Sequence, residues 1–487
     1  MKKSLRSSVI TIVSFSISFL FAASAHSLST DKNQLPEIGT SAVSTLSLDK
    51  ERIYGQAMMR SVRASQPIIH DPVLIEYIND LGNELVKNAD GVNYQFQFFL
   101  LNNKELNAFA FFGGHIGTHS GLITMAENES ELASVLSHEI AHVTQRHLAR
   151  KMEAQSRTTP LTIAGMVTGV LLTLINPQAG LATLTTTMAA GQQAGINYTR
   201  SNESEADRVG MNILVNSGFD PNGAPEFFRK MSAKYRYTSK PPAMLLTHPL
   251  PESRITDSRN RAQLYPNKLL APSLNFELAK ARLRARYEGN GKDNISIFTD
   301  EIRRGKYNIK QAALYGQGLS YFEDKQFEKA EEIISNLLSS NPKNLFYVDA
   351  MTDILIEQKK FEPALEMLKK LNLIMPNNQV VTLNYANTAQ KAEQYNLAST
   401  LLQDYLIVNR EDFVANDLLT QVYRKQKKTA QMHAQQAEVY ALLGAYPKAI
   451  DELHTAYNAT AKNTLMQKRI KARILQFQEQ EDQLKRL

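Results

Sequence analysis

Apolar residues recur at helical intervals along most of the chain, and one short stretch follows a different period. Residues 51–65 and 72–88 carry apolar side chains three or four positions apart, which predicts two amphipathic helices. In residues 94–100 apolar and polar side chains alternate, as they do in a strand. Residues 108–122 predict further strand, interrupted by two adjacent glycines and closed by a serine and a glycine. The folded part of the chain should therefore begin with helices and a small sheet.

A third helix is predicted over residues 128–143. Asn128 is a typical N-cap, and Glu131 follows at the spacing of a capping box. An apolar stripe then runs along one face through Leu132, Val135, Leu136 and Val143.

A strongly apolar run follows at residues 161–189. Its first arm has 15 residues, Leu161–Ile175, before Pro177 interrupts it, whereas a membrane-spanning helix needs about 20. The run is therefore predicted to form a buried or lid-like helical hairpin packed against protein. The alternative is peripheral contact of this hairpin with a membrane surface or an apolar substrate.

The second half of the chain repeats with a period of 34 residues. Aromatic and small residues recur at that interval: Phe327, Phe361 and Tyr395, and Ala330, Ala364 and Ala398. This period is typical of tetratricopeptide repeats, pairs of helices that pack closely through small residues. The register slips after Arg410 and returns at Tyr446, which predicts an extra or degenerate helix near 411–428. Such an array presents a concave surface to a protein partner, or serves as a spacer.

The first residues have the pattern of an export signal. Lys2, Lys3 and Arg6 precede an apolar run at residues 9–21, and a small-x-small cleavage site ends at Ala25. Thirteen residues interrupted by serines are short for an uncleaved membrane anchor. We expect cleavage after Ala25 and, since no cysteine follows, no lipid anchor. In a bacterium the mature protein would then be soluble in the periplasm.

Composition narrows the chemistry that the chain can use. It contains no cysteine, so disulfides and thiolate metal ligands are excluded, and a metal site has to use histidine and carboxylates. The net charge is +7, or +4 without the three basic residues of the signal. Lysine and arginine are dispersed among acidic residues, which argues against a nucleic-acid partner.

The strongest chemical signal is the stretch His138-Glu139-Ile140-Ala141-His142. On a helix, residues four apart project from nearly the same face, so both imidazoles can bind one metal ion. Glu139 then lies beside the metal without coordinating it. Its carboxylate can take a proton from a water molecule that the metal acidifies, which is the chemistry of a zinc hydrolase.

A third protein ligand is expected from the acidic stretch at residues 202–207. Glu203 and Asp207 share a helix face because they lie four residues apart. One of these carboxylates can complete a His, His, Glu set that leaves a fourth place for water, and the other can orient a ligand histidine. The spacing does not separate this arrangement from a solvated acidic face.

The predicted sheet bears on function in two ways. A strand at its edge can pair with an extended peptide through main-chain hydrogen bonds, whereas a covered strand cannot, and the pattern leaves both open. His115 and His119 also lie in this segment. Their turn-rich surroundings predict polar positions in loops for both, without metal ligation.

Taken together, these motifs resemble peptidase family M48 over about residues 50–260. The resemblance rests on five stretches in the family's order: Asn107-Ala108-Phe109, His138-Glu139-Ile140-Ala141-His142, Glu203-Ser204-Glu205-Ala206-Asp207, Thr247-His248-Pro249 and Arg254. It implies one zinc ion per chain and a zincin-like (gluzincin) peptidase fold. It further implies that the metal ligands are His138, His142 and Glu203.

The same resemblance implies roles for four further residues. Glu139 would be the general base, Asp207 would orient a ligand, and His248 and Arg254 would approach the catalytic centre. A histidine beside an open metal position can stabilise the oxyanion or bind the metal and displace water. We hypothesise a mobile segment, residues 244–252, that allows either role for His248, the alternative being a buried histidine that satisfies a loop carbonyl. His147, five residues past His142, points off the ligand face and is predicted to be structural.

The expected fold is mainly α with a small β-sheet, an M48 metallopeptidase domain followed by a helical tetratricopeptide solenoid. The predicted order is a signal peptide (1–25), a leader (26–45), the metallopeptidase domain (46–263), a linker (264–275) and the repeat domain (276–487).

The pairing of an exported M48 domain with a C-terminal repeat array resembles envelope proteases of this family in Gram-negative bacteria. It implies a periplasmic zinc endopeptidase that degrades misfolded or stalled outer-membrane β-barrel proteins and assists their assembly. The repeat domain would contact the barrel-assembly machinery. The alternative is a non-proteolytic chaperone or assembly adaptor with a structural or permanently closed zinc site.

Overall fold

The computed structural model describes residues 46–156, 192–236, 243–460 and 464–486. Two helices come first, α1 (Leu48–Ser65) and α2 (Pro72–Val86). Each begins at a side chain that caps a free backbone N–H: Ser47 accepts from Lys50 and Asp71 from Leu74. Both helices predicted from the apolar pattern are therefore confirmed, with shifts of a few residues at their ends.

A three-stranded sheet follows, with strands β1 (Gln97–Leu101), β2 (Ala108–Phe111) and β3 (His115–His119) in the order β1-β3-β2. β3 runs parallel to β1 and antiparallel to β2. The hairpin between β2 and β3 closes through a 3-10 turn, Phe112–Gly114, in which Gly113 and Gly114 have φ of 77° and 81°. Only glycine adopts such angles at little cost, which explains the adjacent pair. Among the described strands β2 pairs with β3 alone, so it lies at an edge.

Two expectations for this segment are wrong. The serine and glycine expected to close the strand instead begin a helix, α3 (Ser120–Met125). His115 and His119 lie on β3, not in loops, and both side chains are buried. Their rings contact Phe111 and Phe109 on the neighbouring strand. The flanking turn residues belong to a tight hairpin, so they do not expose the strand between them.

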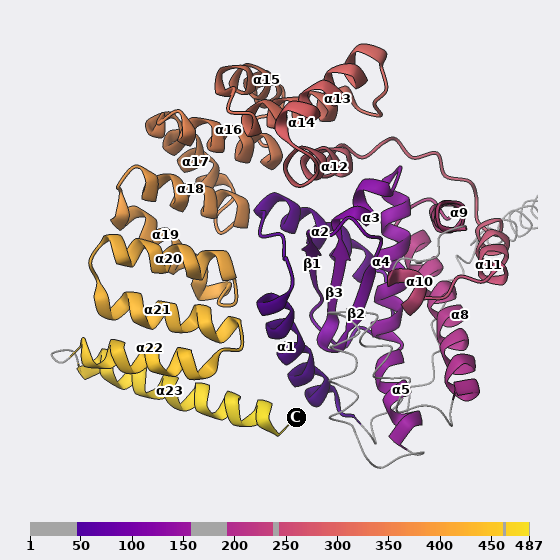
Figure 1. Cartoon of the computed structure of the whole chain (residues 1–487), viewed down its shortest axis with the longest axis horizontal. Helices are drawn as coiled ribbons and strands as arrows, with labels where there is room; N and C mark the ends of the chain where they lie inside the picture. The colour runs from indigo at the N-terminus through magenta and orange to yellow at the C-terminus, as the bar shows by residue number, and fades with distance from the viewer. Residues whose placement is uncertain (1–45, 157–191, 237–242, 461–463, 487) are drawn as a thin grey trace, which may run out of the picture. The chain divides into compact units, whose positions relative to one another are not determined.

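Helix α4 (Glu129–Thr144) packs beside the sheet (Figure 1), and Asn128 caps its start as predicted, accepting from the Glu131 N–H at 3.0 Å. Helices α5 (His147–Ser156), α8 (Gln192–Asn216), α9 (Gly223–Tyr235), α10 (Ala243–Thr247) and α11 (Glu252–Ala262) follow. Gly210 lets α8 approach α4 closely, because a Cβ at this position would lie 3.1 Å from both the Cα and N of His138. The two helices that carry the candidate site are thus in backbone contact.

The remaining described chain is helical throughout. Its helices are α12 (Leu274–Tyr287), α13 (Gly291–Arg304), α14 (Lys310–Glu323), α15 (Phe327–Ser340), α16 (Leu345–Glu357), α17 (Phe361–Ile374), α18 (Gln379–Lys391), α19 (Tyr395–Val408), α20 (Phe413–Lys425), α21 (Thr429–Leu442), α22 (Tyr446–Asn458) and α23 (Thr464–Lys485). Phe327, Phe361 and Tyr395 each begin the second helix of a pair, so the 34-residue period marks the helical repeats.

The slip of the repeat register also has a structural counterpart. A helix, α20, occupies the stretch in which an extra helix is predicted. Tyr446 begins α22 and follows Tyr395 by 51 residues, which is one and a half periods. A single additional helix between two pairs therefore accounts for the shift.

The repeats pack directly on the first part of the chain. One continuous apolar core contains Leu74 of α2, Phe276 of α12 and Val380 of α18. The buried guanidinium of Arg282 bridges Asp71 at 2.6 Å and Asp349 at 2.5 Å. This ion pair joins the N-cap of α2 to helices α12 and α16.

The apolar run at residues 161–189 lies outside the described residues. Within the part of the chain that the structure describes, no helix is both long and apolar enough to cross a membrane.

Candidate metal centre

His138 and His142 project from the same face of α4, as their spacing predicts. Their Nε2 atoms lie 3.0 Å apart, and both rings are largely buried. The apolar face of α4 holds this arrangement in place, because Leu136 and Ile140 between them are fully buried in the core.

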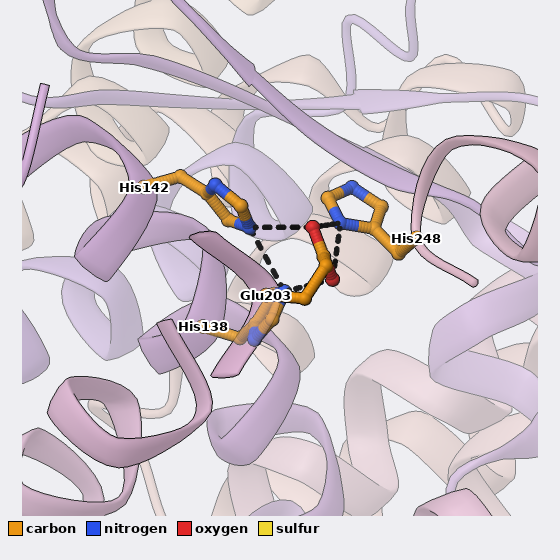
Figure 2. Close-up of side chains that lie close together, drawn as sticks. All are labelled: His138, His142, Glu203 and His248. Atoms are coloured by element: carbon orange, nitrogen blue, oxygen red, sulfur yellow. Dashed lines mark hydrogen bonds and ion pairs between the residues drawn. The ribbon is translucent and has the colours of Figure 1, made fainter. Parts of the chain in front are cut away.

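Glu203 reaches the two histidines from α8. Its carboxylate oxygens lie 3.4 Å from the Nε2 atoms of His138 and of His142. His248, which follows α10, places Nδ1 3.1 Å from Glu203 Oε1 (Figure 2). These four residues offer ligand atoms that all lie within 4.8 Å of one another. The structure thus brings together residues from three segments that are distant in sequence.

The spacing of these atoms fits a metal ion. Nitrogen and oxygen ligands bind Zn²⁺ at 2.0–2.2 Å, so two such ligands of a tetrahedral ion lie about 3.4 Å apart. The distances from Glu203 to His138 and His142 match this value. Neutral imidazoles with a carboxylate are also the donor set that zinc prefers when no cysteine is available.

Glu139 lies beside the cluster without joining it. Its side chain is almost completely buried, and its Oε1 has no hydrogen-bond partner in the described part of the chain. The nearest charged neighbour of this oxygen is His248 Nε2, at 3.6 Å. An unpaired buried carboxylate oxygen is costly, so its retention points to a function in proton transfer.

Asp207 and Arg254 support the cluster from behind. Asp207 Oδ1 lies 3.0 Å from the Nδ1 of His138, the ring nitrogen that faces away from the cluster. Arg254, on α11, donates to both oxygens of Asp207 at 2.7 Å and also contacts Glu203 at 2.7 Å. This pairing fixes the orientation of one histidine and one carboxylate of the candidate metal site.

Sequence reasoning missed the position of His147. The structure places its Nδ1 2.9 Å from the Nδ1 of His142, and its Nε2 3.2 Å from Glu205. A continuous helix would have turned His147 off the ligand face, but α4 ends before it. Arg146, with a φ of 53°, redirects the chain. Neither glycine nor proline marks this break, so the apolar pattern gave no signal of it.

The electrostatics of the cluster are dominated by its carboxylates. Burial by itself lowers the pKa of His138, but hydrogen bonds to Asp207 and Glu203 outweigh burial and raise the pKa to about 10. Burial likewise raises the pKa of Glu203, but the facing histidines bring it well below its usual value. Both shifts show that the carboxylates stabilise positive charge at the centre of the cluster, where a cation would lie.

Two histidines on one helix, a carboxylate from a second helix and a free buried glutamate define a metal-dependent peptidase site of the His-Glu-x-x-His class. Residues 73–262 match the model of peptidase family M48. Together with the relatives described next, this match shows that the chain belongs to peptidase family M48, and it is therefore a metallopeptidase.

Similar proteins cover nearly the whole chain. The putative β-barrel assembly-enhancing protease of Vibrio cholerae is 46% identical over 453 residues, 93% of this chain and 94% of that protein. The β-barrel assembly-enhancing protease of Escherichia coli K12 is 43% identical over 451 residues, 93% of this chain and 92% of that protein. A solved tetratricopeptide repeat protein from Parabacteroides merdae covers 50% of this chain and is itself covered to 97%, at 14% identity and a TM-score of 0.29. The last similarity is too low to carry an argument about function.

Proposed function

We propose that the protein is a zinc-dependent endopeptidase that degrades misfolded or stalled outer-membrane β-barrel proteins. The observation that carries this proposal is the unpaired Oε1 of Glu139 beside the cluster of His138, His142 and Glu203. A structural metal site needs ligands but no neighbouring base. The names of the Vibrio cholerae and Escherichia coli relatives support the choice of substrate.

In this proposal His138, His142 and Glu203 bind one Zn²⁺ ion per chain. Bound zinc supplies Lewis-acid chemistry, which polarises the scissile carbonyl and lowers the pKa of water. Glu139 accepts the proton of the attacking water and returns it to the nitrogen of the leaving amine. Asp207 holds the ring of His138, and Arg254 holds Asp207 and Glu203 in turn.

His248 controls access to the site in this proposal. It lies where a fourth ligand would bind, and it also lies within reach of Glu139. The adjoining cavity, lined by Phe228, Met231 and Met244, has a volume of about 30 Å³, room for about one water molecule. A substrate side chain therefore requires movement of residues 244–252, which would also release His248 for oxyanion stabilisation.

The remaining proposals concern the setting of the site. The metallopeptidase domain comprises residues 46–263, and the repeat domain, residues 276–487, binds the barrel-assembly machinery or the unfolded substrate. The bacterial envelope is the location that fits the relatives, and the export pattern of residues 1–25 refines it to the periplasm. A role in assisting barrel assembly follows from the same names.

The position of His248 favours one alternative. If this residue binds the metal permanently, the protein acts as a chaperone or assembly adaptor without proteolysis. The intact base, Glu139, argues against this alternative.

The decisive experiment compares the wild type with Glu139→Gln. Metal content is measured by elemental analysis, and cleavage is followed with an unfolded outer-membrane β-barrel protein. We expect about one zinc ion in each protein and loss of cleavage in the variant only. Equal cleavage by both would exclude Glu139 as the base, and absence of cleavage by the wild type would favour the adaptor.

A further inference from the structure

The two histidines of the His-Glu-x-x-His motif are both supported through the ring nitrogen that faces away from the cluster. Behind His138 this support is direct, since Asp207 lies 3.0 Å from Nδ1 and Arg254 holds Asp207. Behind His142 there is no carboxylate. The partner of its Nδ1 is another imidazole, that of His147, at 2.9 Å.

The tautomers of these two rings follow from the geometry. The Nε2 of His142 faces the cluster and has to be unprotonated to bind a metal, so the proton of this ring is on Nδ1. That N–H can donate only if the Nδ1 of His147 carries a lone pair. The proton of His147 is then on Nε2, which lies 3.2 Å from Glu205 and donates to its carboxylate.

The far end of this chain of hydrogen bonds is anchored. Arg150, one turn further along α5, donates to the same oxygen of Glu205 at 2.8 Å. The side chain of His147 is 4% exposed, so water does not compete for its nitrogens. Each motif histidine is thus linked to a carboxylate and an arginine, His138 directly and His142 through one additional ring.

A distinctive backbone turn places His147 in this position. α4 ends at Thr144 and α5 begins at His147, and between them Arg146 adopts a left-handed conformation with a φ of 53°. Such a conformation costs about 1 kcal/mol for a residue with a side chain. The buried Arg146 is held there by Glu51, with a distance of 2.9 Å from its Nε, and by the carbonyl of Leu46 at 2.6 Å.

We propose that His147 is a positioning residue of the metal centre, which accepts the Nδ1 proton of His142 and fixes its ring for metal binding, with Glu205 selecting the required tautomer. This inference rests on the proposed zinc site. Hydrogen-bonding partners of metal-bound histidines orient the ring and raise its basicity, and their loss typically weakens metal binding about 10- to 100-fold. His147 itself contributes no metal ligand in this proposal.

The test measures Zn²⁺ affinity of the full chain by competition with a chromophoric chelator, and the visible spectrum of the Co²⁺-loaded protein. We expect His147→Leu to bind Zn²⁺ about 10- to 100-fold more weakly than the wild type and to show an altered Co²⁺ spectrum. His147→Asn should recover part of the affinity, because its amide oxygen lies near the position of Nδ1 and can accept the proton of His142.

His119→Leu is the matched control. It removes another buried histidine by the same substitution, from a ring that contacts the Glu105 carbonyl and lies outside the cluster. We expect this control to retain wild-type Zn²⁺ affinity. If His147→Leu does not fold, Glu205→Ala decides the question, because its side chain is 26% exposed and its loss removes the tautomer-selecting group.

The outcomes separate this inference from the proposed function. Wild-type protein that binds no Zn²⁺ would overturn the zinc site itself. Wild-type binding, together with unchanged affinity and Co²⁺ spectrum in His147→Leu, would overturn the positioning role alone. Equal losses in His147→Leu and His119→Leu would also overturn it, because they would reflect general destabilisation.

Discussion

At the scale of single residues, the ion pairs behind the metal centre combine burial with charge. Arg254 is buried and contacts Asp207, Glu203 and the carbonyl of Pro249. Removing one partner of a buried ion pair leaves the others unpaired and typically costs 3–5 kcal/mol. We therefore expect Arg254→Ala to lower the free energy of unfolding by about 3–5 kcal/mol, measured by urea denaturation of the metal-free protein.

Arg229→Ala is the control for this prediction. Arg229 forms an ion pair with Glu226 in which both side chains are about half exposed. Pairs of this kind contribute about 0–1 kcal/mol. Equal losses in the two variants would show that the buried pairing of Arg254 does not stabilise the fold.

A second residue-scale prediction concerns pH. Burial lowers the pKa of His115 to about 4, and the nearby charges of Arg63 and Arg60 act in the same direction. Because the folded state disfavours the protonated ring, stability is unaffected above the unfolded pKa of about 6.5 and falls as the pH decreases from there towards 4. The loss attributable to His115 at pH 5 is about 2 kcal/mol.

His115→Gln should remove this part of the acid sensitivity. We expect the difference in unfolding free energy between pH 7 and pH 5 to be about 2 kcal/mol smaller in the variant than in the wild type. His454→Gln, which changes an exposed histidine, should leave the difference unchanged. An identical pH dependence in His115→Gln and the wild type would contradict the prediction.

Local spacing explains which site residues could be predicted. His138 and His142 face one metal position because of the helical period alone, and the separation of Glu203 from Asp207 follows the same rule. His147 could not be placed in this way. Its position depends on the left-handed backbone of Arg146, which is stabilised by Glu51, almost a hundred residues earlier in the chain.

At the scale of elements, the metal site depends on the separation of α4 and α8. These helices touch at Gly210, whose position leaves no room for a larger side chain against His138. We expect Gly210→Val to push α8 away from α4. Since the proposed ligands lie on both helices, Zn²⁺ affinity should fall, and overpacking should destabilise the fold by about 1–3 kcal/mol.

Gly318→Val provides a comparison with similar crowding. A Cβ at Gly318 would lie 2.9 Å from the side chain of Ile334, between α14 and α15 and away from the metal site. This variant should lose stability while retaining Zn²⁺ affinity, as measured by chelator competition. Unchanged affinity in Gly210→Val would show that the contact of α4 with α8 does not set the ligand geometry.

The repeat helices were predictable from sequence because their aromatic and small residues recur every 34 positions. Their turns carry a second signal with the same period. Lys325, Lys359, Glu393 and Lys427 lie 34 residues apart, and each has a left-handed φ close to 60°. Lysine and glutamate have no marked preference for this conformation, so composition did not reveal it.

At the scale of the whole molecule, the junction between the first part of the chain and the repeats could not be read from sequence. Asp71 precedes Pro72 and looks like an ordinary N-cap, a role that it does perform for Leu74. Its second oxygen binds Arg282, which is 211 residues further along the chain. A local pattern contains no information about such a partner.

This junction predicts how the protein unfolds. Because the apolar core continues from α2 into the repeats, and Arg282 bridges Asp71 and Asp349 within it, the two parts should unfold together in one calorimetric transition. Arg282→Ala leaves two buried carboxylates without their shared cation and should lower stability by about 3–5 kcal/mol, or separate the transition into two. Arg284→Ala tests whether the effect belongs to the junction, since Arg284 lies on the same helix but pairs with Glu301 inside the repeat region. That control should change stability by about 1 kcal/mol or less. Two independent transitions in the wild type would show that the continuous core does not couple the two parts.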